Sequence, residues 1–197
     1  MPDAIARFMP APMVKKRHAI LVRAPASLVL EVAETFELES IWLVRALFRA
    51  RAKLLRASSQ PPRRMKGLVE EMTGIGWGVL AREPGRLLVA GAATRPWEAD
   101  VTFTPISPDD FASFAEPDQV KIVWTLEAEP LGPTLTRFAT ETRVEPTDEG
   151  ARRKFQRYWR TFGAGIVLIR WVLLPAVRRE AERRFTGPAG AMPPPTP

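Results

Sequence analysis

The 197-residue sequence contains no cysteine and only one histidine, His18. Without cysteine the chain cannot form disulfides, thiolate metal sites or a cysteine nucleophile, which fits a reducing compartment, so we predict a cytoplasmic protein. A single histidine cannot build a two-histidine metal centre. The carboxylates of one acidic loop, Asp109, Asp110, Glu116 and Asp118, lack the spacing of a calcium loop. We therefore expect neither a metal nor a cofactor.

Long hydrophobic runs are also missing. The charges of the N-terminal stretch MPDAIARFMPAPMVKKRHAI are scattered, and it has no apolar core typical of a signal peptide. The longest apolar run near the C-terminus, GAGIVLIRWVLLPAV, is interrupted by Arg170 and Pro175 and is shorter than the ~20 residues of a membrane span. The sequence predicts a soluble protein.

Positive charge is in excess, with a net charge of +7. Such an excess favours partners that carry phosphate, but no helix-turn-helix, zinc finger or aromatic RNA-binding signature accompanies it, so we expect no nucleic-acid partner. An amphipathic helix is predicted from about Glu39 to Ala57. Its basic stripe indicates either a solvated face or weak contact with an anionic membrane, and consists of Arg45, Arg49, Lys53 and Arg56.

The pattern of elements predicts an α+β fold in a single domain, residues 15–186, between a flexible tail at 1–14 and a flexible, Pro-rich tail at 187–197. A first strand precedes two short helices near the N-terminus. About five or six antiparallel strands follow, including a hairpin through Pro84 and Gly85. A long helix, capped by Thr147 or Asp148, then runs to about Arg184 along one apolar stripe.

Three stretches resemble the START/SRPBCC superfamily, the pollen-allergen-like helix-grip fold, and in particular its uncharacterised bacterial, polyketide-cyclase-like branch. They are LVRAPASLVLEV, WGVLAREPGRLLVAGAATRPW, and TRFATETRVEPTDEGARRKFQRYWR running into GAGIVLIRWVLL. The resemblance implies a curved antiparallel sheet wrapped around the long C-terminal helix, with a largely apolar cavity between them. Members bind lipids, sterols, polyketides or hormones, and some catalyse cyclisation or dehydration. No residue constellation carries a named reaction over to this chain.

The last predicted strand, 135–144, carries most of the information about a site. Side chains alternate along a strand, so Phe138, Thr140, Thr142 and Val144 share one face, and Arg137, Ala139, Glu141 and Arg143 share the other. If the first set faces inward, its threonine hydroxyls can orient a ligand and the second set is solvated. The opposite facing would bury Glu141 with Arg170 as a charged pair in the cavity.

We therefore predict that an internal cavity binds a hydrophobic small molecule or a lipid. Its walls and polar anchors are predicted to be Trp97, Phe103, Trp124, Phe138, Thr140, Thr142, Phe162 and Ile166. Gly163 and Gly165 would weaken the long helix and form either a hinge that admits ligand or a simple kink.

Two other functions stay open. One is a cyclase or dehydratase acting on a polyketide-like substrate, which requires a cavity carboxylate with a raised pKa, here Glu141. The other is a peripheral membrane module that docks through the basic helix.

Overall fold

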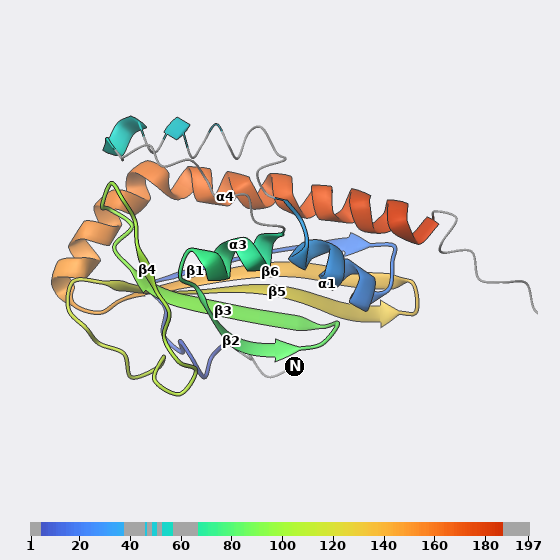
Figure 1. Ribbon diagram of the computed structural model, residues 1–197, viewed down its shortest axis with the longest axis horizontal. Helices are drawn as coiled ribbons and strands as arrows, with labels where there is room; N and C mark the ends of the chain where they lie inside the picture. The colour runs from blue at the N-terminus through green and yellow to red at the C-terminus, as the bar shows by residue number, and fades with distance from the viewer. Residues whose placement is uncertain (1–4, 38–45, 47–48, 51–52, 57–66, 187–197) are drawn as a thin grey trace, which may run out of the picture.

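The computed structural model describes residues 5–37, 46, 49–50, 53–56 and 67–186 (Figure 1). Most of the helix predicted at 39–57, including Arg45, lies outside the described residues, as does the predicted C-terminal tail. Arg49, Lys53 and Arg56 of its basic stripe are described and exposed.

The order of elements is a strand, helices, strands and one long helix. The bounds are β1 (Val14–Val22), α1 (Ala26–Glu34), α3 (Leu68–Gly74), β2 (Gly78–Glu83), β3 (Leu87–Thr94), β4 (Phe103–Thr104), β5 (Val120–Gly132), β6 (Leu135–Pro146) and α4 (Glu149–Thr186). The hairpin predicted at Pro84 and Gly85 joins β2 to β3, and Gly85 adopts a φ of 69°, which suits glycine. The sequence analysis missed α3, because its seven residues are too few to show a helical period.

The strands form one antiparallel sheet in the order β1-β6-β5-β3-β2, with β4 paired to β3. The chain therefore returns from the β2-β3 side to place β6 between β5 and β1, the first strand. In this register His18 of β1 lies opposite Thr140 of β6, and Trp124 of β5 lies opposite Thr142. This curved sheet with α4 lying across it is the predicted helix-grip fold, of the α+β class (Figure 1).

One face of the sheet is covered by α1, α3 and α4 (Figure 1). The main core cluster lies between this face and the three helices. It comprises Val22, Ala24, Val29, Leu30, Val32, Ala33, Leu68, Leu88, Leu126, Ala128, Phe138, Leu173, Leu174, Val177 and Ala181. We call this the helix-facing side of the sheet.

The helix α4 is continuous over 38 residues. Asp148 caps it, because one carboxylate oxygen accepts a hydrogen bond from the backbone N–H of Ala151 at 2.8 Å. The other carboxylate oxygen accepts from the backbone N–H of Asp118, and these bonds lower the pKa of Asp148. Gly163, Gly165 and Pro175 all stay within the helix, so the chain shows a helical backbone at the predicted interruption.

Contrary to the expectation from its interrupted sequence, α4 is long and apolar enough to cross a membrane, with an 18-residue window of mean hydropathy 1.5, 29% of it buried. Length and composition alone do not decide the matter, because a helix packed in the core of a soluble protein passes the same test. Both ends of α4 pack against the sheet or α1 through Phe155, Leu173 and Val177.

The opposite face of the sheet is covered by the N-terminal segment and the loop after β4. Ile5, Phe8 and Met9 are buried there with Phe111, in a second core cluster that also contains Val89 and Val123. The structure thus corrects the prediction of a flexible tail for residues 5–13. Ile5, Phe8 and Met9 have the i, i+3, i+4 spacing of a helix, but they span a single turn, which is too short for periodicity to reveal a packed segment.

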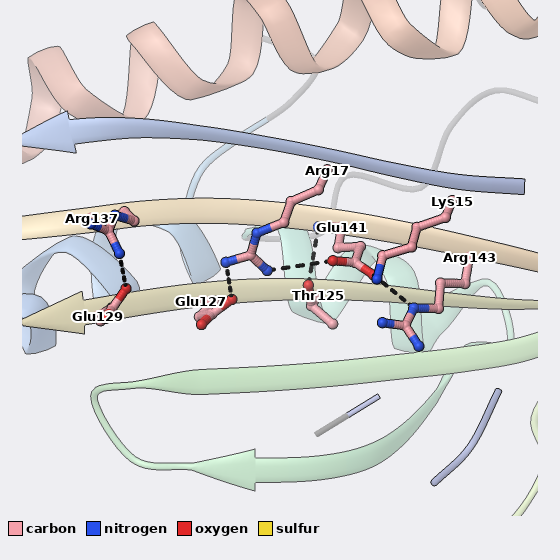
Figure 2. A network of polar contacts seen from close by, with 8 residues as sticks. All are labelled: Lys15, Arg17, Thr125, Glu127, Glu129, Arg137, Glu141 and Arg143. Carbon is pink, nitrogen blue, oxygen red and sulfur yellow. Dashed lines mark hydrogen bonds and ion pairs between the residues drawn. The ribbon is translucent and has the colours of Figure 1, made fainter. Parts of the chain in front are cut away.

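Buried charges also lie on this outer side. Glu141 and Arg143 are only 3% and 2% exposed, and the Nε of Arg143 lies 2.7 Å from Glu141 Oε1. Lys15 and Arg17 from β1 approach the same carboxylate at 3.6 and 3.4 Å (Figure 2). A second nitrogen of Arg143 donates to the carbonyl of Met9 at 3.1 Å. Glu141 and Arg143 of the predicted outer set are therefore buried under the N-terminal segment and not solvated, whereas Arg137 of the same set is exposed.

Replacing Glu141 by glutamine is expected to lower the free energy of unfolding by about 3 kcal/mol, since it leaves Arg143 buried without its counter-charge. Chemical denaturation measures this. Glu129→Gln on the same sheet is the control, because its pair with Arg137 is exposed and should contribute about 0–1 kcal/mol. Equal losses in the two variants would mean that the Glu141 network does not hold this layer together.

Candidate functional site

The helix-facing side of β6 presents Phe138, Thr140, Thr142 and Val144 to α4. Phe138 belongs to the main core cluster with Leu173 and Val177 of α4, and Val144 packs with Phe155 near the start of the same helix. Side chains of a strand alternate, so the two threonines between them point to the same side. Thr140 is fully buried and Thr142 nearly so.

The apolar core under α4 is divided in two. The main core cluster contains α4 residues from Leu173 onward, whereas the cluster of Val120, Val144 and Phe155 lies under the first turns of the helix. The polar side chains Thr140, Thr142 and Arg170 lie between these clusters. The helix therefore crosses a polar patch in the middle of an otherwise apolar interface.

Three buried polar atoms have no hydrogen-bond partner among the described residues, namely His18 Nδ1, Thr140 Oγ1 and one terminal nitrogen of Arg170, Nη1. Other buried threonines have partners. Thr136 Oγ1 donates to the carbonyl of Ala24 at 2.7 Å, and Thr125 Oγ1 accepts from the backbone N–H of Glu141 at 3.1 Å. Because an unpaired buried polar group costs about 1–3 kcal/mol, its persistence calls for an explanation.

These three groups belong to β1, β6 and α4, three elements that pack against one another. His18 and Thr140 are directly opposite in the register of β1 and β6, a position at which side chains on one face are neighbours. Arg170 is buried in α4, and the ring of the next residue, Trp171, packs edge-on against the His18 ring at 5.7 Å between centroids. We call His18, Thr140 and Arg170 the polar triplet.

Arg170 is the electrostatic anomaly of this site. It is only 5% exposed, and burial lowers its pKa to about 10, against the opposing field of Glu141. Four charged side chains are buried among the described residues, and Lys121, Glu141 and Arg143 each have an ion pair or hydrogen bonds to a charged partner. No described residue forms a hydrogen bond or an ion pair with Arg170. A buried charge without a partner is strongly unfavourable.

The structure does not bring Glu141 and Arg170 together as the predicted pair. Glu141 forms its ion pairs with Lys15, Arg17 and Arg143 on the outer side of the sheet, whereas Arg170 lies on the helix-facing side. Only the field of Glu141 reaches Arg170. Strand alternation causes this separation, because Glu141 follows Thr140 directly.

The predicted aromatic wall is only partly assembled. Trp124 packs against the main core cluster beside Phe138 and lies opposite Thr142, whereas Trp97 packs near Phe155 and carries Lys154 over its ring at 5.7 Å. The ring of Phe162 lies against Tyr158 at 5.0 Å. Phe103 lies on β4 and stacks on Trp77 at 5.3 Å, away from the triplet. Of Ile166, only its place within α4 is described.

The hollows of the described surface lie away from the triplet. One of about 240 Å³ is lined by Arg7, Phe8, Pro108, Asp109 and Ala112. Another of about 270 Å³ lies between α1 and the end of α4, lined by Val32, Thr35, Phe36, Glu37, Glu180 and Arg184. Neither of these two lies between the sheet and the middle of α4, where we predicted an internal cavity.

Chemically, the triplet can donate hydrogen bonds and offers one positive charge. It contains no carboxylate that could act as a base, and among residues 5–37 and 67–186 no group of three or more His, Cys, Asp or Glu side chains could hold a metal ion. The arrangement is suited to holding a negatively charged or strongly polar group.

The sequence analysis considered His18 only as the single histidine of the chain and did not connect it with Thr140. The connection depends on pairing between the first and last strands, which are more than a hundred residues apart. From the sequence, strand alternation could show only that His18, Ile20 and Val22 share one face of the first strand. It could not show that Trp171 reaches that face.

No protein-family model and no curated protein matches this chain. Among solved structures, the Zhui aromatase/cyclase from Streptomyces sp. R1128 is similar, with a TM-score of 0.32 and 16% identity over 91% of this chain and 99% of that one. A similarity of this degree says nothing about the ligand or the reaction.

Arg170→Met is expected to raise the free energy of unfolding of the ligand-free protein by about 1–3 kcal/mol at neutral pH, because it replaces an unpaired buried cation with an apolar chain of similar length. The pKa of about 10 is below the ordinary value of 12.5, so the penalty is complete below about pH 10 and falls only as the pH rises through that value. Thermal and chemical denaturation measure it. Arg160→Met, at an exposed position of α4, is the control and should change little. Destabilisation by Arg170→Met would show that Arg170 is a structural residue.

Proposed function

We propose that the protein binds a hydrophobic small molecule or lipid between the sheet and the middle of α4. The observation that carries this proposal is the polar triplet, three buried and unpartnered polar groups within an apolar interface. A ligand with an apolar body and a polar end would satisfy both surfaces at once. The helix-grip fold also supports the START/SRPBCC resemblance, in which such binding is common.

In this proposal the ligand enters at the edge of the sheet formed by β1. β1 is an edge strand, and His18 is half-buried on it beside Trp171, which is 64% exposed. Thr140 lies one strand further in, on β6, and Arg170 is buried in α4. In this proposal Trp171 and the middle of α4 move away from β1 to admit the ligand. The two glycines of this part of the helix lower the energy needed to bend it.

A cyclase that uses Glu141 as its base receives no support from the geometry. That carboxylate is held by three cations on the side of the sheet away from α4. Binding without turnover is the function that the arrangement favours.

The test is mass spectrometry of organic extracts from freshly purified protein, together with extracts of two tryptophan variants. Trp124→Ala removes a side chain next to Thr142, whereas Trp77→Ala, a half-buried tryptophan that stacks on Phe103, is the control. An apolar molecule should be present in the wild type and Trp77→Ala and be strongly depleted in Trp124→Ala. Equal amounts in all three would place the ligand elsewhere. An empty wild type that also fails to bind added dodecanol and dodecanoate would contradict the function.

A second candidate function is docking on an anionic membrane, and one surface of α4 favours it. The residues exposed at helical spacing in its middle are apolar, including Ala164, Leu168, Trp171 and Pro175. Exposed arginines lie on either side, Arg157 and Arg160 before them and Arg178 and Arg179 after them. Over its whole length α4 contains ten Lys or Arg residues but only three Glu residues. An apolar strip with a tryptophan and basic flanks suits the interface of an anionic bilayer.

Flotation with vesicles of phosphatidylcholine and phosphatidylserine tests this second function. Binding should weaken with salt and fall when Trp171→Ala and Leu168→Ser are combined. Leu131→Ser is the control, because Leu131 is about as exposed as Leu168 (42% and 40%) but lies at the end of β5. Equal binding by the two variants, or none by the wild type, would remove the membrane function.

A further inference from the structure

The charge balance of the buried interface restricts the kind of ligand. On the outer side of the sheet the buried cations face carboxylates, as with Arg143 and Glu141. On the helix-facing side Arg170 is buried with no such partner among the described residues. An isolated cation in an apolar environment is stable only if an anion joins it or if it loses its proton, and arginine does not lose its proton at neutral pH.

The neighbours of Arg170 add hydrogen-bonding capacity. Thr140 Oγ1 can donate one hydrogen bond, and His18 Nδ1 can donate one when it carries the proton. Together with the Arg170 nitrogen these make three donors from three different elements, all unpartnered and directed into one interface. A carboxylate accepts up to four hydrogen bonds and prefers the planar guanidinium of arginine.

Resting on the ligand-binding function proposed above, we infer that the bound molecule is an amphiphile with a carboxylate, which Arg170 holds together with Thr140 and His18. One buried cation balances one negative charge. A phosphate monoester carries nearly two negative charges at neutral pH and would leave an unbalanced charge in the interface. An uncharged alcohol or sterol would leave Arg170 without its counter-charge. The ligand class is therefore fatty acids and similar apolar carboxylic acids.

The apolar part of the ligand has a surface to follow. From Thr140 the helix-facing side continues towards Leu126 and Phe138 in one direction and towards Thr142 and Trp124 in the other. The second direction leads to the half-buried Trp124 and to the part of α4 that packs least tightly, with Phe162 and Val167 partly exposed. Burying a saturated chain there removes apolar surface of both partners from water.

Matched probes test the charge of the ligand. Delipidated protein is titrated by calorimetry with dodecanoate, dodecanol and dodecyl phosphate at about pH 8, where the carboxylic acid is ionised. Dodecanoate should bind on the order of tenfold to a hundredfold more tightly than dodecanol, as expected for a buried charge-assisted hydrogen bond. It should also bind more tightly than dodecyl phosphate.

Variants of Arg170 test whether this residue supplies the positive charge that selects dodecanoate. Arg170→Gln should abolish the preference for dodecanoate over dodecanol, and Arg170→Lys should keep part of it because the charge remains. Arg160→Gln removes an exposed arginine of the same helix and should have no effect. Thr140→Val, similar in shape, should weaken dodecanoate binding a few-fold through one lost hydrogen bond.

The outcomes separate the two proposals. Equal binding of dodecanoate and dodecanol, or a preference that survives Arg170→Gln, would overturn the carboxylate assignment and leave ligand binding intact. Tighter binding of dodecyl phosphate would overturn it in favour of a phosphate ligand. Binding of none of the three probes would contradict the ligand-binding function itself.

Discussion

Strand β6 is covered on both faces, and the rest of the structure depends on this constraint. On one face Arg143 contacts the N-terminal segment, and on the other Phe138 and Val144 pack in the clusters that contain residues of α4. Each side chain of a strand must point to one side or the other, so a single stretch, TETR, supplies buried groups to both layers. Polar residues on a strand that is buried on both faces need hydrogen-bond or ion-pair partners. The layer on the outer side of the sheet and the layer on the helix-facing side differ in whether they supply such partners.

The outer layer provides them fully. Glu141 lies among three cations, and Lys121 donates to the carbonyls of Phe111 and Ala112 and pairs with Glu145. These contacts hold the N-terminal segment and the loop after β4 against the sheet. The helix-facing layer leaves Arg170, Thr140 and His18 unsatisfied. Groups that are unfavourable for stability persist most readily where they serve binding, which is why the site is assigned to this layer.

Much of the fold could be predicted from local patterns. The β2-β3 hairpin followed from Pro84 and Gly85, the cap of α4 from Asp148, and the length of α4 from its apolar stripe. Strand alternation likewise separates Thr140 from Glu141 without any structure. The missed features depend on contacts between distant segments: residues 5–9 pack on a face formed by β3 and β5, and five residues are too few to show a period. The polar triplet needs the pairing of β1 with β6 and the rotation of α4, and neither is encoded within one segment.

Packing between the sheet and the helices explains why only some of the aromatic residues predicted to line a cavity lie near one another. Apolar side chains of the sheet and the helices pack onto one another, because an empty apolar space loses dispersion contacts on both sides. Trp124 and Phe138 therefore lie in or against the core, whereas Arg170 cannot collapse into a paired state, since strand alternation places the nearby carboxylate of Glu141 on the other side of β6. The polar groups thus mark the site more clearly than the aromatic ones do.

The most direct test of this account is a crystal structure of the protein with a dodecanoic acid that carries bromine on its last carbon, located by its anomalous signal. The account predicts the carboxylate within hydrogen-bond distance of the Arg170 guanidinium and of Thr140 Oγ1, with the bromine between the sheet and α4. A bromine in the hollow beside Phe8 or in the one between α1 and α4, with Arg170 still unpartnered, would contradict it.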